Sequence, residues 1–268
     1  MSVNSEYQPL PLIMVAPNGA RKTKADHPAL PMSIAETVEA AQACLKEGAG
    51  CLHAHVRDEA GAHVLDAHLY KELLTELEAR APGIDVQITT EAVGRYSPQD
   101  QQALVRGVHP RAVSIAIREM VPDEVPEDAR TFYAWAHSEK IAVQHILYDA
   151  QDLQRFFELV EAGVIPGKQH QLLFVLGRYA TNQESGPEDL DPFLTALTKG
   201  RGDLALDWAV CAFGHRETEC LVAAIGEGGK ARIGFENGLW NRDGSLAKDN
   251  ADRVRDLVAA LKERGLFN

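Results

Sequence analysis

Short apolar runs alternate along the whole chain with longer segments in which apolar residues recur every three or four positions. Each short run is rich in Val, Ile or Leu and shows no clean alternation of apolar and polar residues, which is typical of strands buried on both faces. We expect eight strands, at residues 10–17, 50–56, 85–90, 111–117, 141–148, 170–176, 205–212 and 231–236.

The longer segments carry the start and stop signals of helices. Ser33 stands three residues before Glu36, which is the spacing of a capping box, and Gly48 ends that segment. Ser97 comes directly before Pro98, a cap followed by a proline in the first turn. We expect eight helices, at residues 33–48, 66–83, 97–108, 126–140, 149–163, 187–200, 217–228 and 250–265.

Eight strand–helix units in about 250 residues have the length and rhythm of a (β/α)8 TIM barrel, an α/β fold. No linker-like segment or shift of composition divides the chain, so residues 1–268 are expected to form a single barrel domain. The rival fold is a doubly wound open sheet. The connection after the first strand, PNGARKTKADHPALPMS, is long and lacks the GxGxxG motif of that fold.

Composition narrows the possible functions. Apolar residues make up 45% and charged residues 25% of the 268 positions, as in ordinary globular proteins, and the net charge of −12 argues against a nucleic-acid partner. No apolar run is long enough for a membrane span, and the N-terminal segment lacks the basic region of a signal peptide. Because no CxxC pair occurs, a reducing cytoplasm is expected for the four cysteines, Cys44, Cys51, Cys211 and Cys220.

Two histidines mark the end of the second expected strand. His53 and His55 are separated by one residue, so they point the same way from the strand. The carboxyl ends of the strands form the face where such barrels carry their chemistry. One buried histidine is readily explained by hydrogen bonds to its neighbours, but two on one strand face favour a metal ion.

A catalytic zinc needs three protein ligands and one open position. In the last expected strand, Arg232, Gly234 and Glu236 share parity, and that strand lies next to the first and near the second in a closed barrel. Glu236 is therefore the expected third ligand. The alternative for Glu236 is an ion pair with Arg232 or Arg57, and Cys51 is expected to lie deeper as a packing residue.

Other polar residues near strand ends are expected to line the same mouth. Each alone would be an ordinary rim residue, and only their convergence points to a substrate carboxylate or carbonyl. They are Asn18, Thr89, Thr90, Glu91 and Ser114, with Tyr148, His145 and Arg178 as further rim candidates. No role is assigned to most of the remaining histidines, His27, His63, His68, His109, His137, His170 and His215.

Four segments carry a resemblance to a known family: LIMVAPNGARKTKADHPALPMS, CLHAHVRDEAG, FVLG and ARIGFENGL. In order and over nearly the whole chain, they resemble the β-keto acid cleavage enzymes, typified by 3-keto-5-aminohexanoate cleavage enzyme. The resemblance implies a zinc-bearing (β/α)8 barrel, usually a homotetramer. It also implies a reaction in which a 3-keto acid and acetyl-CoA give acetoacetate and a new acyl-CoA.

By this likeness His53, His55 and Glu236 would be the zinc ligands and Arg232 the catalytic arginine. The likeness also assigns two substrate-binding positions, because Thr89 stands where the family often has a serine and Ser114 stands at or near a threonine.

The chain departs from the family pattern at three positions. Asn237 replaces an aspartate of the catalytic group, and since an amide cannot act as a base, Glu91 or a zinc-bound water would have to remove the proton. The segment TTEAVG, which contains Glu91, replaces a glycine-rich end of the third strand. Arg21 stands where members with amino-bearing substrates have an acidic residue, which favours a substrate with an anionic or polar far end.

Two other functions remain open from the sequence. A metal-dependent hydrolase on the same barrel also uses an H-x-H pair, although that pair belongs on the first strand and needs further histidines on strands five and six. His145 offers one on strand five, whereas strand six has none at its end. A non-catalytic member that binds an acyl-CoA or keto acid is the second alternative, which Asn237 keeps open.

Overall fold

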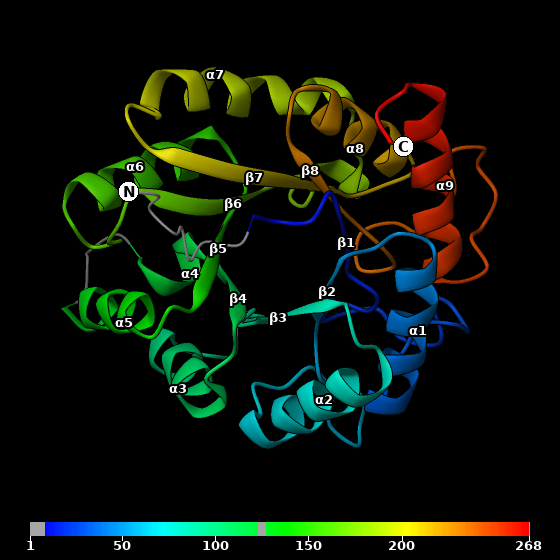
Figure 1. The fold of residues 1–268 in the computed structure, drawn as a ribbon, viewed down its shortest axis with the longest axis horizontal. Coiled ribbons are helices and arrows are strands. Elements are labelled where there is room, and N and C mark those ends of the chain that lie inside the picture. Colours follow the sequence, from blue (N-terminus) through cyan, green and yellow to red (C-terminus); the bar gives the residue numbers. More distant parts are fainter. Residues whose placement is uncertain (1–8, 123–126, 268) are drawn as a thin grey trace, which may run out of the picture.

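The computed structural model describes residues 9–122 and 127–267, and its strands form one closed barrel in the order β1 to β8. Each strand pairs in parallel with its two neighbours, and β8 closes the ring against β1. Figure 1 shows the helices outside this ring. The expected (β/α)8 fold is confirmed. The strands are Ile13–Val15, Cys51–Ala54, Asp85–Thr89, Ala112–Ala116, Ala142–Leu147, Gln169–Leu176, Ala205–Ala212 and Lys230–Ile233.

Helices follow the strands where the sequence predicts them. The capping boxes at Ser33 and Ser97 are both present. The structure adds the short helix α4 after β4 and two 3-10 turns before α7, and the expected helix start at residue 126 lies outside the described residues. The α-helices, α1 to α9, are Ile34–Lys46, Ala67–Arg80, Pro98–Val108, Ile117–Met120, Glu127–Ser138, Ala150–Glu161, Asp191–Gly200, Glu217–Gly226 and Asn250–Glu263, and the 3-10 turns, η1 and η2, are Thr181–Gln183 and Pro187–Leu190.

Several strands are shorter than expected, and β8 ends three residues before the expected carboxyl end. The expected strand runs to residue 236, whereas the observed one ends at Ile233. Gly234 has φ +142°, and a Cβ there would lie 2.4 Å from the carbonyl oxygen of Ala16. The chain therefore turns out of the sheet at a glycine, and Glu236 reaches its place from a turn rather than by strand alternation.

Buried apolar side chains form three clusters, and two of them contain residues of the strands. The larger cluster lies between the strands and the helices, and a smaller one lies inside the barrel, with Met14, Cys51, Leu173 and Cys211 among its members. Both faces of the strands are thus buried, which is why their sequences show no clean alternation. Inside the barrel, polar side chains lie beyond the small apolar cluster, and they form the candidate site.

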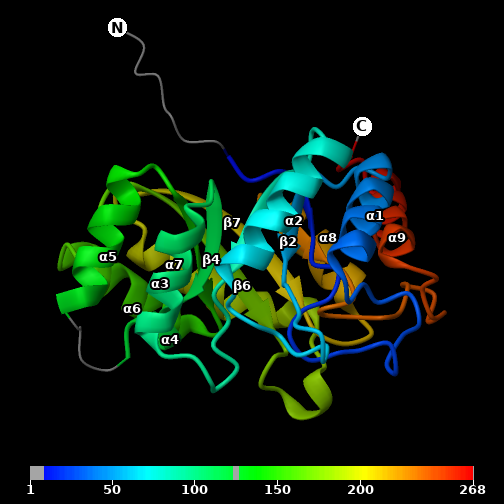
Figure 2. The same ribbon diagram turned by 90° about the horizontal axis from the view of Figure 1, so that it is seen from below.

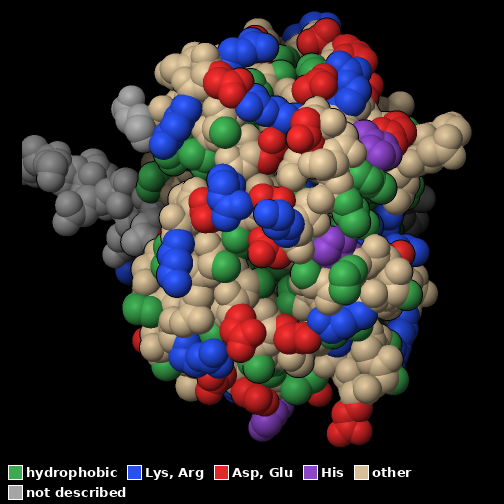
Figure 3. Space-filling view, turned by 90° about the vertical axis from the view of Figure 1, so that its right-hand side faces the viewer, with side chains coloured by type: hydrophobic (Ala, Val, Ile, Leu, Met, Phe, Trp, Pro, Cys, Tyr) green, Lys and Arg blue, Asp and Glu red, His purple; other side chains and the backbone are tan. Residues whose placement is uncertain are grey.

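The long connections gather at one end of the barrel. Figure 2 shows the β1–α1 connection (blue) and the β6–α7 connection (yellow-green) on its lower side, where the carboxyl ends of the strands point. On the face seen in Figure 3, acidic and basic side chains are interspersed rather than gathered in one field. None of the helices in the described part of the chain has the length and apolar character needed to cross a bilayer.

Candidate metal centre

His53 and His55 lie side by side at the end of β2. His53 belongs to the strand and His55 follows its last residue, and both side chains are buried. Their Nε2 atoms are 3.3 Å apart, and their rings are nearly perpendicular, at 75°. The two imidazoles therefore direct the same ring nitrogen toward one point, as the sequence predicts.

Glu236 meets this pair from the turn after β8. Its Oε2 atom lies 3.6 Å from Nε2 of His53 and 3.7 Å from Nε2 of His55. The main chain of Glu236 is held on both sides, because its N–H donates to the carbonyl of Ala16 and its carbonyl accepts from Nζ of Lys22 at 2.7 Å. A Cβ at position 19 would lie 2.6 Å from the Glu236 side chain, so the glycine there leaves room for the carboxylate.

The three ligand atoms fit a divalent metal ion. An ion with tetrahedral bonds of about 2.0–2.1 Å separates its ligand atoms by about 3.3–3.4 Å, close to the separations of 3.3, 3.6 and 3.7 Å found here. Glu236 Oε2 is buried and has no hydrogen-bond partner among the described residues. Because buried polar atoms normally have a partner, this oxygen fits the role of a metal ligand. The set of two imidazoles and one carboxylate suits zinc and leaves a fourth position open.

Protonation also fits a metal site. Burial lowers the pKa of His53 to about 4 and that of His55 well below its ordinary value, and the nearby arginine and histidine charges act in the same direction. Burial opposes the ionisation of Glu236, but Arg232 and the other nearby positive charges together more than compensate, so the pKa of Glu236 falls below its ordinary value. Neutral imidazoles and an ionised carboxylate are the forms that bind a metal.

Arg232 lies beside the carboxylate, inside the barrel. Its Nη2 atom is 3.5 Å from Glu236 Oε1 and 3.5 Å from the Cys211 sulfur, while Nε and Nη1 are buried without a partner in the described structure. Glu236 is therefore placed both to bind a metal ion and to pair with Arg232, since one oxygen faces the imidazoles and the other faces Arg232. Arg57 lies elsewhere, where it donates to main-chain carbonyls of residues 18, 19, 22 and 61 and so fixes the loop after β1.

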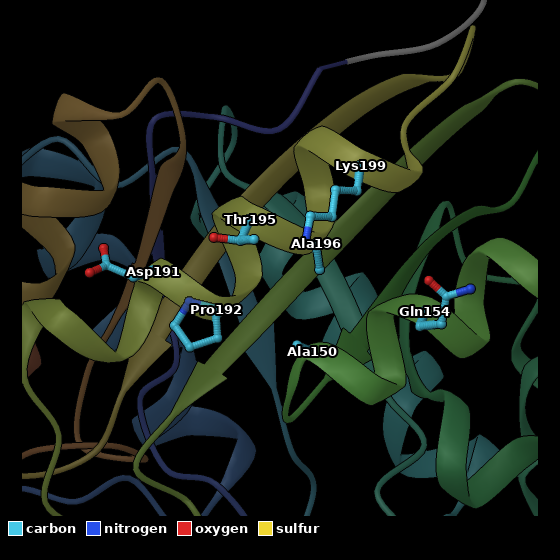
Figure 4. A pocket seen from close by; sticks show the side chains of 7 residues that line it. All are labelled: Ala150, Gln154, Asp191, Pro192, Thr195, Ala196 and Lys199. Carbon is cyan, nitrogen blue, oxygen red and sulfur yellow. The ribbon is translucent and has the colours of Figure 1, made fainter.

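A pocket of about 240 Å³ opens onto Glu236. Asn18, Arg21 and Glu91 line it, together with Lys22 and Arg178. A larger hollow, about 550 Å³, lies outside the barrel between α6 and α7 and contains none of the predicted site residues (Figure 4).

Glu91 is a half-buried acid of this pocket that is not among the three candidate ligands. Its carboxylate lies 3.7 Å from Arg178 NH2 and 3.9 Å from Nδ1 of His55. Burial, and then the charge of Glu236, raise the pKa of Glu91 to about 7. A carboxyl group that titrates near neutrality can both accept and return a proton.

The other predicted polar residues are buried near the site. Thr89 and Ser114 are register partners on β3 and β4; the Thr89 hydroxyl accepts from the N–H of Glu91, whereas the Ser114 hydroxyl has no partner in the described parts of the chain. The amide of Asn18 donates to the carbonyl of His55, and neither polar atom of the Asn237 side chain has a described partner.

Two sequence interpretations need correction. His145 is not a rim residue, because its ring packs outside the barrel against Tyr133 of α5 and Phe156 of α6. A hydrolase with a ligand at this position on strand five is therefore not supported. His63, which has no role in the sequence interpretation, lies with its Nδ1 3.3 Å from Nδ1 of His55.

A turn signal in the sequence indicates how His63 arrives there. The segment RDEAGAH folds back on itself, because Asp58 accepts from the N–H groups of Ala60 and Ala62 and Gly61 adopts φ +79°. This turn pairs Arg57 with His63. An Asp and a Gly at this spacing are typical turn residues, so the return of His63 to the strand end was readable from the sequence. No pattern in the sequence indicated that Lys22 would contact the main chain of Glu236.

Comparison with known proteins gives consistent matches. The sequence model of the beta-keto acid cleavage enzymes matches residues 11–266. A 3-keto-5-aminohexanoate cleavage enzyme of Fusobacterium nucleatum is 24% identical over 261 residues, covering 95% of this chain and 92% of that protein. A 3-oxoadipate:acetyl-CoA acetyltransferase of Cupriavidus necator is 26% identical over 260 residues, covering 95% and 89%.

Solved structures agree in fold. ObcA in its binary complex with oxaloacetate aligns with a TM-score of 0.69 at 15% identity, over 90% of this chain and 65% of ObcA, so the chain spans slightly less than two thirds of that protein's length. A type I 3-dehydroquinate dehydratase of Clostridium difficile aligns with a TM-score of 0.62 at 11% identity, covering 96% of this chain and 93% of that one. At these identities the likeness shows the barrel fold alone.

Proposed function

The chain belongs to the beta-keto acid cleavage enzyme family, and we propose that it is a zinc-dependent enzyme that transfers the acyl group of a 3-keto acid to CoA, with acetyl-CoA as co-substrate. The observation that carries the proposal is the convergence of His53, His55 and Glu236 beside the donors of Arg232 that have no partner among the described residues. Relatives named as a keto acid cleavage enzyme and as an acetyl-CoA acetyltransferase support the same reaction class.

The bonds of the reaction balance without a further reactant. Loss of a C2 proton from the 3-keto acid gives a carbanion, which attacks the carbonyl carbon of acetyl-CoA and releases the CoA thiolate. The thiolate then attacks the former keto carbon, the bond between C2 and C3 breaks, and the proton returns to C2. The products are acetoacetate and the CoA thioester of the remaining acyl group.

His53, His55 and Glu236 would hold the zinc ion, which when bound polarises the keto and carboxylate oxygens of the substrate. Arg232 is placed to stabilise the negative charge that develops on those oxygens, through the two donors that have no partner within the described residues. An arginine stays protonated at neutral pH, so its role is electrostatic.

Glu91 is our candidate for the base. Asn237 stands at the position where the family's base partner is expected, and an amide cannot take up a proton. Of the acidic residues that line the pocket, Asp26 is exposed and bonded to Thr23, and Glu236 is a candidate metal ligand. Glu91 remains as a half-buried carboxylate beside the site.

The cation at the mouth of the pocket favours an anionic substrate. Arg21 is exposed at the mouth, and Lys22 and Arg178 line the same wall. A cation at position 21 attracts a distal carboxylate and repels an ammonium group. We therefore infer a 3-keto acid with an anionic or polar far end, with Asn18, Thr89 and Ser114 as further substrate-binding residues.

We also infer how the protein assembles and where in the cell it works. The family resemblance favours a homo-oligomer, in particular a tetramer, built from one barrel domain per chain. The four cysteines are buried and unpaired, which fits a reducing cytoplasm.

A substrate screen tests the proposal. The purified zinc-loaded enzyme is mixed with acetyl-CoA and each of a panel of 3-keto acids, and acyl-CoA products are followed by mass spectrometry, with chelator-treated protein as the control. We expect a new acyl-CoA and acetoacetate in equal amounts, and no product without metal. Hydrolysis to free acids, or acyl transfer that survives complete metal removal, would contradict the proposal.

A further inference from the structure

A chain of hydrogen bonds crosses the barrel and ends at His53. The amide of Gln144 donates to the main-chain carbonyl of Leu172, and its oxygen accepts from Nε2 of Gln87 at 3.0 Å. The oxygen of Gln87 lies 2.9 Å from Nδ1 of His53. A main-chain carbonyl can only accept, so it fixes the orientation of both amides, and the amide oxygen of Gln87 requires a proton on Nδ1 of His53.

A second chain of the same kind ends at His55. Nε2 of His63 lies 3.0 Å from the main-chain carbonyl of Glu91, so it carries the proton of a neutral ring. Nδ1 of His63 is then a bare acceptor, 3.3 Å from Nδ1 of His55, which must be the donor. The Glu91 carboxylate is a weaker partner for His55, because it lies 3.9 Å from the same nitrogen.

Both hydrogen-bond chains place the proton of the metal-binding imidazole on Nδ1. A neutral imidazole with its proton on Nδ1 has its lone pair on Nε2, and these are the two nitrogens that face Glu236. We propose that His63, Gln87 and Gln144 are positioning residues, which fix the tautomers of the two metal-binding imidazoles through relays anchored on main-chain carbonyls. The relays rest on the contacts above, and their role in zinc binding rests on the proposed function.

His63 is not itself a ligand of the proposed ion. It faces Nδ1 of His55, while Nε2 of that ring faces Glu236, so the His55 ring lies between His63 and the metal position. Partners of this kind fix ring orientation and raise ligand basicity, and their loss typically weakens metal binding about 10–100-fold.

Four variants separate the relays from general packing. His63→Leu and Gln87→Met each remove the acceptor for one ring, whereas His63→Gln keeps an oxygen for His55 and an N–H for the Glu91 carbonyl. His170→Leu is the matched control for His63, since His170 is also buried and bonds to a main-chain carbonyl, that of Gly167 at 3.2 Å, but lies outside the barrel.

The first measurement needs no metal. Imidazole ¹⁵N NMR of the metal-free protein reports which ring nitrogen carries the proton. We expect protonated Nδ1 on both rings of the wild type, a change at His55 alone in His63→Leu, and a change at His53 alone in Gln87→Met. A wild type with protonated Nε2 on His53 or His55 would overturn the relay to that ring.

The second measurement is the zinc dissociation constant, from competition with a chelator. We expect about 10–100-fold weaker binding in His63→Leu and Gln87→Met, and values within a few-fold of the wild type in His63→Gln and His170→Leu. Wild-type affinity in His63→Leu and Gln87→Met would overturn the relays while leaving the metal centre intact. A wild-type protein that binds no zinc would overturn the proposed centre and, with it, the role of the relays.

Discussion

Two clusters of buried histidines lie on opposite faces of the same sheet. The inner one, His53, His55 and His63, lies inside the barrel mouth, and the outer one, His145 and His170, packs between the barrel and α5 and α6. Burial lowers the pKa of every member. Desolvation by itself therefore produces neutral imidazoles in both places, and it does not distinguish a metal site from a packing cluster.

The two clusters differ in their neighbours. The outer rings contact the aromatic residues Tyr133 and Phe156. In the inner cluster, His53 and His55 are oriented by polar partners at Nδ1, and at Nε2 they face the buried Oε2 atom of Glu236. A ligand set thus requires directed lone pairs and a counter-charge, in addition to burial. Four substitutions, described in order of decreasing effect on turnover, test whether the inner cluster binds a metal and the outer one only packs.

Removing the Glu236 carboxylate should abolish metal binding by the inner histidines. In Glu236→Gln we expect loss of stoichiometric zinc and a fall in kcat/KM of about 10³-fold or more, because an amide is a poor ligand and the metal contributes several kcal/mol to transition-state stabilisation. Metal analysis and acyl-CoA assays measure both. Glu263→Gln, an exposed glutamate paired with Arg242, is the control, and full zinc with full rate in Glu236→Gln would refute the assignment.

Removing the arginine should separate chemistry from metal binding. Arg232→Met eliminates the two unpaired donors but none of the three ligand atoms. We expect kcat/KM to fall about 10²–10³-fold, as for the loss of a preorganised donor, with zinc content close to that of the wild type. A rate within threefold of the wild type would show that the inner cluster works without this charge.

Reversing the charge at the mouth should alter selectivity more than rate. In Arg21→Glu we expect the ratio of kcat/KM for an anionic over an amino-bearing 3-keto acid to fall about tenfold or more, since the side chain lines the pocket at its exposed end. Zinc content should not change. Faster cleavage of the amino-bearing substrate by the wild type would remove the basis of this prediction.

Removing an outer histidine should leave turnover unchanged and show itself only in stability against pH. Burial lowers the pKa of His170 to about 4, so below pH 6.5 the unfolded chain binds a proton that the folded chain refuses. The free energy of unfolding therefore falls as the pH drops from about 6.5 to about 4. His170→Leu should remove at most about 3 kcal/mol of this fall.

Urea unfolding of the metal-free protein at a series of pH values between 7 and 4 measures this contribution. The inner histidines give the wild type and the variant a common remaining slope. If the free energy of unfolding of His170→Leu has the same slope against pH as that of the wild type, the pKa of His170 is not lowered in the folded protein.

Local sequence patterns were enough to predict the alternation of strands and helices and the capping residues of the helices. Apolar runs without alternation indicated strands covered on both faces, and Ser33 and Ser97 cap their helices as predicted. These features depend on neighbours within a few residues, so they can be read from the chain. The spacing of His53 and His55 likewise fixed their common direction.

Only the tertiary structure decided which residues meet across the barrel. The sheet register decided that Gln144 points inward and His145 outward, because a shift of one residue exchanges the two faces of a strand. The turn at Gly234 sets where Glu236 lies. Contacts between segments far apart in the chain depend on closure of the whole ring, which local sequence patterns do not encode.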